Sequence, residues 1–300
     1  MKTFIDDFKY TWNKPNNSLV KLIIINVIVW VFLNLCFFIS KITNNDGFFD
    51  AIFINLAVQS SLSQFIYKPW TLVTYFFTHR DFFHILYNMI FMYWFGKIIE
   101  EFLGSKKLTA IYIIGGLAGG IAFIIAYNLL GYPNSPMLGA SAGVFAIVVG
   151  AATFQPDYRM YLMFIGPVKI KYVAAVVVFT SFIALPSQNT GGNIAHMGGA
   201  LVGFLFIIQL QKGNDWSKPV TASMDFLANL FRPRSKIKIT YKKKKSNNIP
   251  KGKVKTGPGI PDQAVVDAIL DKISDTGYEK LTKEEKQILF KASQNQKKSE

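Results

Sequence analysis

Residues 135–154 read SPMLGASAGVFAIVVGAATF, and the serine at position 141 stands in the order Gly-Ala-Ser-Ala-Gly. This spacing matches the nucleophile elbow of α/β-hydrolases, in which a buried strand precedes the serine and a helix follows it. Residues 131–140 contain two prolines and two glycines, which predict a loop before the serine. Residues 1–210 show no alternation of strand and helix patterns. We therefore interpret Ser141 as lying at the N-terminus of a short apolar helix and reject the α/β-hydrolase fold.

The helix that Ser141 begins is short and rich in small side chains. Eight residues at and after its start are glycine or alanine: Gly139, Ala140, Ala142, Gly143, Ala146, Gly150, Ala151 and Ala152. Small residues let membrane helices approach closely, so this helix is expected at the centre of a bundle. A short span can begin below the membrane surface where protein or water surrounds the preceding loop. The pattern predicts a recessed serine that water can reach.

The composition supports an all-α polytopic membrane protein. Hydrophobic residues make up 51% of the 300 residues, and they gather in runs close to the length of a membrane span. Six spans are predicted, at residues 19–39, 81–99, 108–130, 139–154, 168–185 and 194–210. The chain has one cysteine, Cys36, which excludes a disulfide within the chain and a metal site built from cysteines.

The positive charge is concentrated in a few segments. The net charge is +15, and residues 232–256 hold eleven Lys or Arg and no acidic residue. Beside a membrane, such a segment favours anionic lipid headgroups as its partner, and we expect no nucleic acid. The loops after the second and fourth spans are basic, whereas those after the third and fifth carry no Lys or Arg. By the positive-inside rule both termini are cytoplasmic, and the expected location is a cell membrane, namely the bacterial inner membrane.

The expected domain organisation has four parts. A cytoplasmic N-terminal segment covers residues 1–18, the six-helix bundle covers 19–211, an interfacial and polybasic linker covers 212–259, and a small cytoplasmic helical hairpin covers 260–300. Residues 223–231 fit an amphipathic helix in the membrane interface or an ordinary solvated tail, and the sequence leaves both open. In the hairpin, Thr282 and Glu285 form a capping box.

Two of the three histidines lie inside predicted spans, where ionisable groups are costly and usually functional. His196 lies near the start of the sixth span, and Gly199 and Gly203 give that helix a face that can pack closely on the serine helix. Ser141 and His196 then lie near the same end of the bundle, as a nucleophile and its base. Because neither span has a carboxylate that could orient His196, a dyad is expected and a triad is not.

Other side chains extend this site. His84 and Asn88 are four residues apart on one helix face of the second span and could hold an oxyanion. Phe145, one turn after Ser141, could form an aromatic wall for the imidazole. No metal ion or organic cofactor is expected.

The segments HRDFFHILYNM at 79–89, GAS at 139–141 and AHMGGALVG at 195–203 together resemble the rhomboid intramembrane serine proteases over residues 19–211. The resemblance implies a six-helix core, a dyad of Ser141 and His196, and an oxyanion site of His84, Asn88 and the Ser141 amide. It implies that His79 supports the loop above the second span and that transmembrane-anchored proteins are the substrates. Ala142 departs from the family pattern, which usually has glycine there.

Other functions fit part of this pattern. Ser141, His196, His84 and Asn88 could all be packing or hydrogen-bonding residues of a bundle. A catalytically inactive rhomboid-like membrane chaperone or retrotranslocation factor would typically lack the serine or the histidine, and both are present. A six-span transporter would favour internal repeats, which the sequence does not show.

Overall fold

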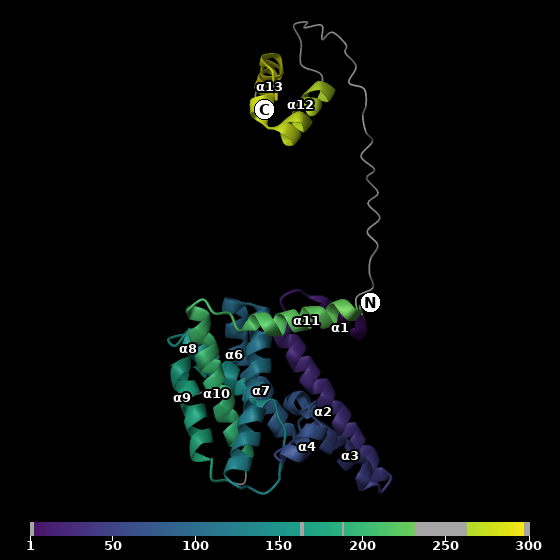
Figure 1. Ribbon diagram of the computed structural model, residues 1–300, viewed down its shortest axis with the longest axis vertical. Helices are drawn as coiled ribbons and strands as arrows, with labels where there is room; N and C mark the ends of the chain where they lie inside the picture. The colour runs from purple at the N-terminus through teal and green to yellow at the C-terminus, as the bar shows by residue number, and fades with distance from the viewer. Residues whose placement is uncertain (1–2, 163–164, 188, 232–262, 297–300) are drawn as a thin grey trace. The chain divides into compact units, whose positions relative to one another are not determined.

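The computed structural model describes residues 3–162, 165–187, 189–231 and 263–296. They divide into two compact units, Met1–Pro233 and Arg234–Glu300. The helices of the first unit are α1 Phe4–Asn13, α2 Ser18–Ile42, α3 Asp46–Leu56, α4 Leu62–Tyr67, α5 Thr71–Thr74, α6 Phe82–Leu103, α7 Ser105–Leu129, α8 Ser141–Phe154, α9 Ile170–Ile183, α10 Thr190–Gln211 and α11 Ser217–Phe231, with the 3₁₀ helix η1 at Tyr75–Phe77 (Figure 1).

A mostly helical membrane fold was predicted from the apolar runs and is confirmed. Among the described residues, α2, α6, α7 and α10 are long and apolar enough to cross a membrane. The helices α8 and α9 are apolar as well, but each has only 14 residues. All six apolar helices form within a few residues of the predicted runs, and four of them meet the usual length of a span.

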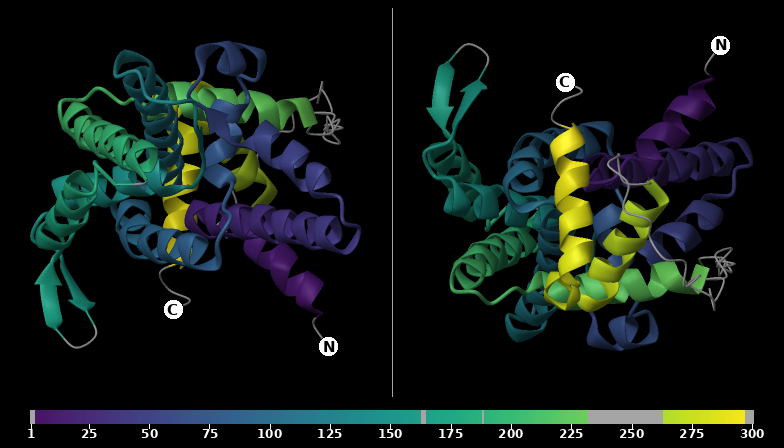
Figure 2. Two further views of the ribbon diagram at one scale, coloured as in Figure 1. Left: turned by 90° about the horizontal axis from the view of Figure 1, so that it is seen from below. Right: turned by 90° about the horizontal axis from the view of Figure 1, so that it is seen from above.

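The short helix α8 lies among the other apolar helices and packs on α6, α7, α9 and α10 (Figures 1 and 2). Its small side chains explain this position because they let its backbone meet those of its neighbours. A Cβ atom at Gly199 of α10 would overlap the carbonyl oxygen of Ala142, and one at Gly203 would overlap that of Ala146. The two glycines therefore let α10 and α8 touch backbone to backbone, as their spacing predicts.

The long connection between α2 and α6 supports the loop that leads into α8. Strand β1, Val58–Gln59, pairs antiparallel with β2, Pro136–Met137, in that loop. The Gly139 amide donates to the Tyr75 carbonyl at 2.9 Å, and Tyr75 itself is buried. The start of α8 is thus held by main-chain hydrogen bonds on both sides of Leu138.

An all-α fold was expected, and the strands of the first unit correct that expectation. Besides β1 and β2, the strands β3, Arg159–Leu162, and β4, Gly166–Lys169, pair antiparallel, and α9 begins at Ile170 instead of residue 168. The Lys169 and Lys171 ammonium groups lie 2.9 Å from the Asp157 carboxylate, and they lower the pKa of that carboxyl group to about 2. This ion pair closes the base of the hairpin, a tertiary contact that residue patterns do not reveal.

The helix α1, in the polar segment before α2, was not predicted either. Thr3 and Asp6 form a capping box at its start: the Thr3 amide donates to the Asp6 carboxylate at 3.0 Å, and the Asp6 amide donates to the Thr3 hydroxyl at 3.3 Å. Residues 223–231, for which the sequence left a helix and a solvated tail open, are helical and form the second half of α11. Lys106 and Lys107 of α7 approach Asp225 and Asp215 at 3.4 and 3.7 Å. The basic residues 232–256 lie outside the described residues.

The second unit contains α12, Gln263–Thr276, the 3₁₀ helix η2, Tyr278–Lys280, and α13, Lys283–Gln296. The predicted capping box of α13 is present: the Thr282 amide donates to the Glu285 carboxylate at 2.8 Å, and the Glu285 amide donates to the Thr282 hydroxyl at 3.3 Å. Lys272 of α12 also reaches Glu285 at 2.7 Å. This ion pair joins the two helices of the unit.

Candidate active site

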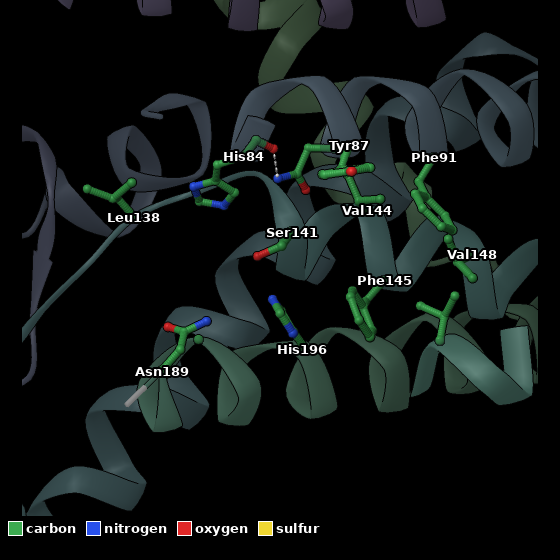
Figure 3. A pocket seen from close by; sticks show the side chains of 13 residues that line it. His84, Tyr87, Phe91, Leu138, Ser141, Val144, Phe145, Val148, Asn189 and His196 are labelled. Atoms are coloured by element: carbon green, nitrogen blue, oxygen red, sulfur yellow. Dashed lines mark hydrogen bonds between the residues drawn. The ribbon is translucent and has the colours of Figure 1, made fainter. Parts of the chain in front are cut away.

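The structure brings five of the predicted site residues to one cavity of about 280 Å³ (Figure 3). Ser141 and Phe145 come from α8, and His196 comes from α10. His84 and Asn88 come from α6. Apolar side chains, including Phe91 and Val148, complete the wall. Three helices separated along the chain therefore present a hydroxyl, two imidazoles and an amide to a common space.

Ser141 lies at the N-terminus of its helix, as predicted, and is the first residue of α8, two positions after the predicted start of the span; its backbone geometry depends on Gly139. Gly139 has φ +123°, which L side chains rarely adopt, and a Cβ atom there would lie 2.7 Å from the His84 ring. The chain can therefore pass against His84 before it turns into the helix. The N-terminus of α8 leaves backbone N–H groups without helical partners close to Ser141, and its dipole adds partial positive charge there.

His79 lies outside the cavity that holds Ser141 and supports the loop before it. The His79 Nε2 accepts a hydrogen bond from the Ala140 amide at 3.2 Å, and the side chain is buried. Burial, and to a smaller extent the nearby His84 ring, lowers the pKa of His79 to about 3. The imidazole is thus neutral near pH 7, and its lone pair is available to the amide.

The imidazole of His196 is held on two sides. The Phe145 ring stacks on it with centroids 4.2 Å apart and planes inclined by 10°. The His196 Nδ1 lies 2.8 Å from the Ser181 hydroxyl of α9. Between Ser141 and His196, both of which the structure describes, there is no hydrogen bond, although the two side chains face the same space (Figure 3). Such catalytic hydrogen bonds are often long before substrate binds.

Asn88 and His84 lie one turn apart on α6. The Asn88 Nδ2 donates one N–H to the His84 carbonyl at 2.8 Å, which fixes the amide plane (Figure 3). An asparagine amide has two N–H donors, so the second can serve a ligand in the cavity. Asn88 is buried, whereas the ring of His84 is partly exposed to the cavity.

The residue that follows the serine is accommodated by α7. Ala142 is buried, and a Cβ atom at Gly119 of α7 would overlap the methyl group of Ala142. Gly119 thus leaves the space that this methyl group occupies. The extra methyl group therefore points away from the cavity and into the helix interface.

Sequence reasoning missed Ser181 and Asn193. No carboxylate was expected to orient His196, and an uncharged partner was not predicted, yet Ser181 contacts the ring and Asn193 contacts Ser181. Asn193 precedes His196 by three residues on α10, and this spacing was a signal that could have been used. In the described part of the chain, no three His, Cys, Asp or Glu side chains lie close enough together to hold a metal ion.

Comparison with known proteins gives two family matches. Residues 67–212 match the rhomboid domain, and residues 261–295 match a family of unknown function, DUF6576. The helices α6 to α10, with every residue of the candidate site, lie within the first match.

Individual relatives agree with the first match. The chain is 31% identical over 157 residues to RHOMBOID-like protein 12, mitochondrial, of Arabidopsis thaliana. This alignment covers 48% of the chain and 47% of the relative. It is 27% identical over 157 residues to the mouse presenilin-associated rhomboid-like protein, mitochondrial, covering 48% and 38%. Rhomboid protein 1, mitochondrial, of Saccharomyces cerevisiae is 28% identical over 136 residues, covering 43% and 38%.

The matched segment thus spans less than half the length of these relatives. These relatives are named as mitochondrial proteins, so they give no support to the bacterial inner membrane expected from the sequence. What the matches and the apolar helices support is a multi-pass membrane protein.

Proposed function

Because this chain belongs to the rhomboid family, whose members are generally intramembrane serine proteases, we propose that it is an intramembrane serine endopeptidase that cleaves transmembrane-anchored proteins. The observation that carries the proposal is the cavity shared by Ser141 and His196 at the N-terminus of α8. A hydroxyl and an imidazole that meet in a protein interior are the parts of an activated nucleophile.

In this mechanism Ser141 attacks the carbonyl carbon of the scissile peptide bond. His196 accepts the hydroxyl proton as general base and then donates it to the leaving amine as general acid. The stacked ring of Phe145 supports the mechanism because it restricts the imidazole to one plane. Water that enters the cavity then attacks the acyl-enzyme, with His196 again as the base.

The tetrahedral intermediate carries a negative charge on the former carbonyl oxygen. The free N–H of Asn88, the ring of His84 and the amide of Ser141 are the donors that we assign to this oxyanion. The position of the first two on α6, beside the N-terminus of α8, supports the assignment. The partial positive charge at the end of α8 adds to the stabilisation.

All six apolar helices cross or enter the membrane in this proposal, with α8 and α9 shorter than a full span. A substrate helix unwinds beside α9, whose Val177 lines the cavity and whose Val176, Phe179 and Phe182 are exposed. The described residues 185–187 and 189–192 form the cap in this proposal, and Asn189 and Gly192 line the cavity.

The basic loops and the segments before α2 and after α10 face the cytoplasm in this arrangement. The position of α1 and α11 at the same end of the bundle supports it (Figure 1). The basic residues 232–256, which lie outside the described residues, would bind anionic lipid headgroups. No nucleic acid is a partner in this proposal.

Purified protein in detergent and a labelled model transmembrane substrate test the proposal. Ser141→Ala and His196→Ala should each abolish cleavage and labelling by a fluorophosphonate probe. Ser63→Ala, in α4 outside the cavity, is the matched control and should keep both. Cleavage that persists in Ser141→Ala would exclude this nucleophile. A folded wild-type protein that binds the substrate without cleaving it would favour the inactive, chaperone-like alternative.

A further inference from the structure

Asn193 has a fixed orientation beneath the cap of the cavity. Its Nδ2 lies 2.6 Å from the Ala184 carbonyl oxygen and 3.3 Å from the Ser187 hydroxyl. A carbonyl oxygen only accepts hydrogen bonds, so the amide nitrogen must face Ala184. The Asn193 Oδ1 therefore faces the opposite way, toward Ser181 of α9.

The orientation of Asn193 sets the direction of the hydrogen bonds at Ser181. The Ser181 Oγ lies 3.0 Å from the Asn193 Oδ1 and 2.8 Å from the His196 Nδ1. The Oδ1 can only accept, so the single hydroxyl proton of Ser181 points to Asn193. Toward His196 the hydroxyl oxygen can then only accept, which requires a proton on the His196 Nδ1.

A neutral imidazole with its proton on Nδ1 has its lone pair on Nε2. Figure 3 shows a ring nitrogen of His196 directed toward Ser141. From these contacts we propose that Ser181 and Asn193 are positioning residues, which hold His196 in the tautomer that can accept the Ser141 proton. The proposal rests on the proposed protease function, in which His196 is the general base.

Burial makes this chain of hydrogen bonds effective. Ser181 is 7% exposed and Asn193 is 5% exposed, so water offers these groups no alternative partners. In such an interior an unpaired polar group is costly, and a fully paired network is rigid. Ser181 does not line the cavity, so it acts on substrate turnover only through His196.

Ser181 and Asn193 also hold His196 after it has accepted the proton. When His196 accepts the Ser141 proton, the imidazolium keeps its Nδ1–H directed at the Ser181 oxygen, and the Asn193 carbonyl oxygen polarises that hydroxyl group. The two residues thus take the orienting place that a carboxylate has in a Ser-His-Asp triad, with no charge.

Steady-state kinetics on Ser181→Ala give the first test. General-base catalysis contributes roughly 10²–10⁴-fold, so loss of the orienting bond should lower kcat about 10- to 100-fold and leave KM unchanged. Ser181→Thr keeps a hydroxyl group and should recover most of kcat. The control is Thr180→Val, because the neighbouring Thr180 hydroxyl bonds only carbonyls of its own helix. Equal kcat in Ser181→Ala and Thr180→Val would overturn the proposal.

A measurement without turnover separates this proposal from the protease function. The chain has three histidines, so the ring nitrogens of His196 can be identified in ¹⁵N NMR spectra by comparison with His196→Gln. In Ser141→Ala protein we expect the Nδ1–H tautomer, and in Ser141→Ala/Ser181→Ala protein a shift toward Nε2–H. A ring protonated on Nε2 while Ser181 is present would overturn the proposal, whether or not the wild-type protein cleaves substrate.

Discussion

The rings of Phe145 and His196 lie face to face, with centroids 4.2 Å apart and planes inclined by only 10°. The two residues belong to different helices, and the contact exists because glycines bring α10 against α8. The ring of the proposed base is thus confined between an aromatic face and the Ser181 hydroxyl. An imidazole held in this way loses little conformational entropy when it meets the nucleophile.

The role of Asn88 can be tested by removing one oxyanion donor. Asn88→Ala should lower kcat roughly 10- to 1,000-fold, in line with the loss of such a donor elsewhere. KM should change little because the donor acts mainly in the transition state. Tyr87→Phe, the neighbouring position on the same cavity, removes one hydroxyl group and serves as the control. Undiminished kcat in Asn88→Ala would remove Asn88 from this role.

The close approach of α10 and α8 predicts that added methyl groups have unequal effects. Gly199→Ala would overlap the carbonyl oxygen of Ala142 and should destabilise the protein by about 1–3 kcal/mol or more. Gly150→Ala in the same interface meets nothing closer than 3.6 Å and should be tolerated. Thermal unfolding in detergent compares the two variants. Similar melting temperatures for both would contradict the packing described above.

The methyl group of Ala142 and the missing side chain of Gly119 form a complementary pair. Gly119→Ala should lower the unfolding temperature. The new methyl group would overlap the Ala142 methyl group and would also lie 2.8 Å from the Ala195 carbonyl oxygen. Ala142→Gly removes the first of these contacts and should restore part of the loss in the double variant. Strictly additive effects would show that the two positions do not interact.

Because His79 is buried, we predict that the stability of the protein depends on pH. Its pKa is about 3 in the folded protein and near 6.5 in an unfolded chain, so between these values only the unfolded chain takes up the proton. The free energy of unfolding should therefore fall as the pH falls from about 6.5 toward 3, by at most about 1.4 kcal/mol per pH unit.

His79→Gln removes this group and isolates its contribution from those of the nearby His84 and Asp81. The stability of wild type and variant in detergent is measured across that pH range. We expect the difference in the free energy of unfolding between wild type and His79→Gln to narrow or reverse as the pH falls. A difference that stays constant with pH would contradict a buried neutral His79.

Much of this structure could be predicted from the sequence, because a membrane makes hydropathy informative. The apolar runs gave the six helices, and the loop character of residues 131–140 gave the start of α8 at Ser141. His84, Asn88 and His196 stood out as polar residues in apolar segments, and the structure gathers them around one cavity. Helix periodicity placed Phe145 one turn after Ser141.

Apart from α1, whose capping box at Thr3 is local, the site and hairpin features that were missed depend on contacts between segments. Ser181 is an ordinary residue of an apolar helix until α9 packs against α10 and brings it to the His196 ring. Asp157 meets Lys169 and Lys171 only because the chain folds back so that β3 pairs with β4. No residue pattern within one segment carries such information, whereas the capping boxes at Thr282 and Thr3 are local and readable.

The short ladder between β1 and β2 divides the loop before α8 into two parts. The two parts differ in how well they tolerate inserted or deleted residues. Residues 131–133 precede the ladder and its Asn134 contacts, so added residues there extend only the surface. From Pro136 to Gly139 every position lies between main-chain bonds to Gln59 and Tyr75. One inserted residue in that stretch would shift the serine hydroxyl out of the cavity, so natural variation in loop length should be confined to the first part.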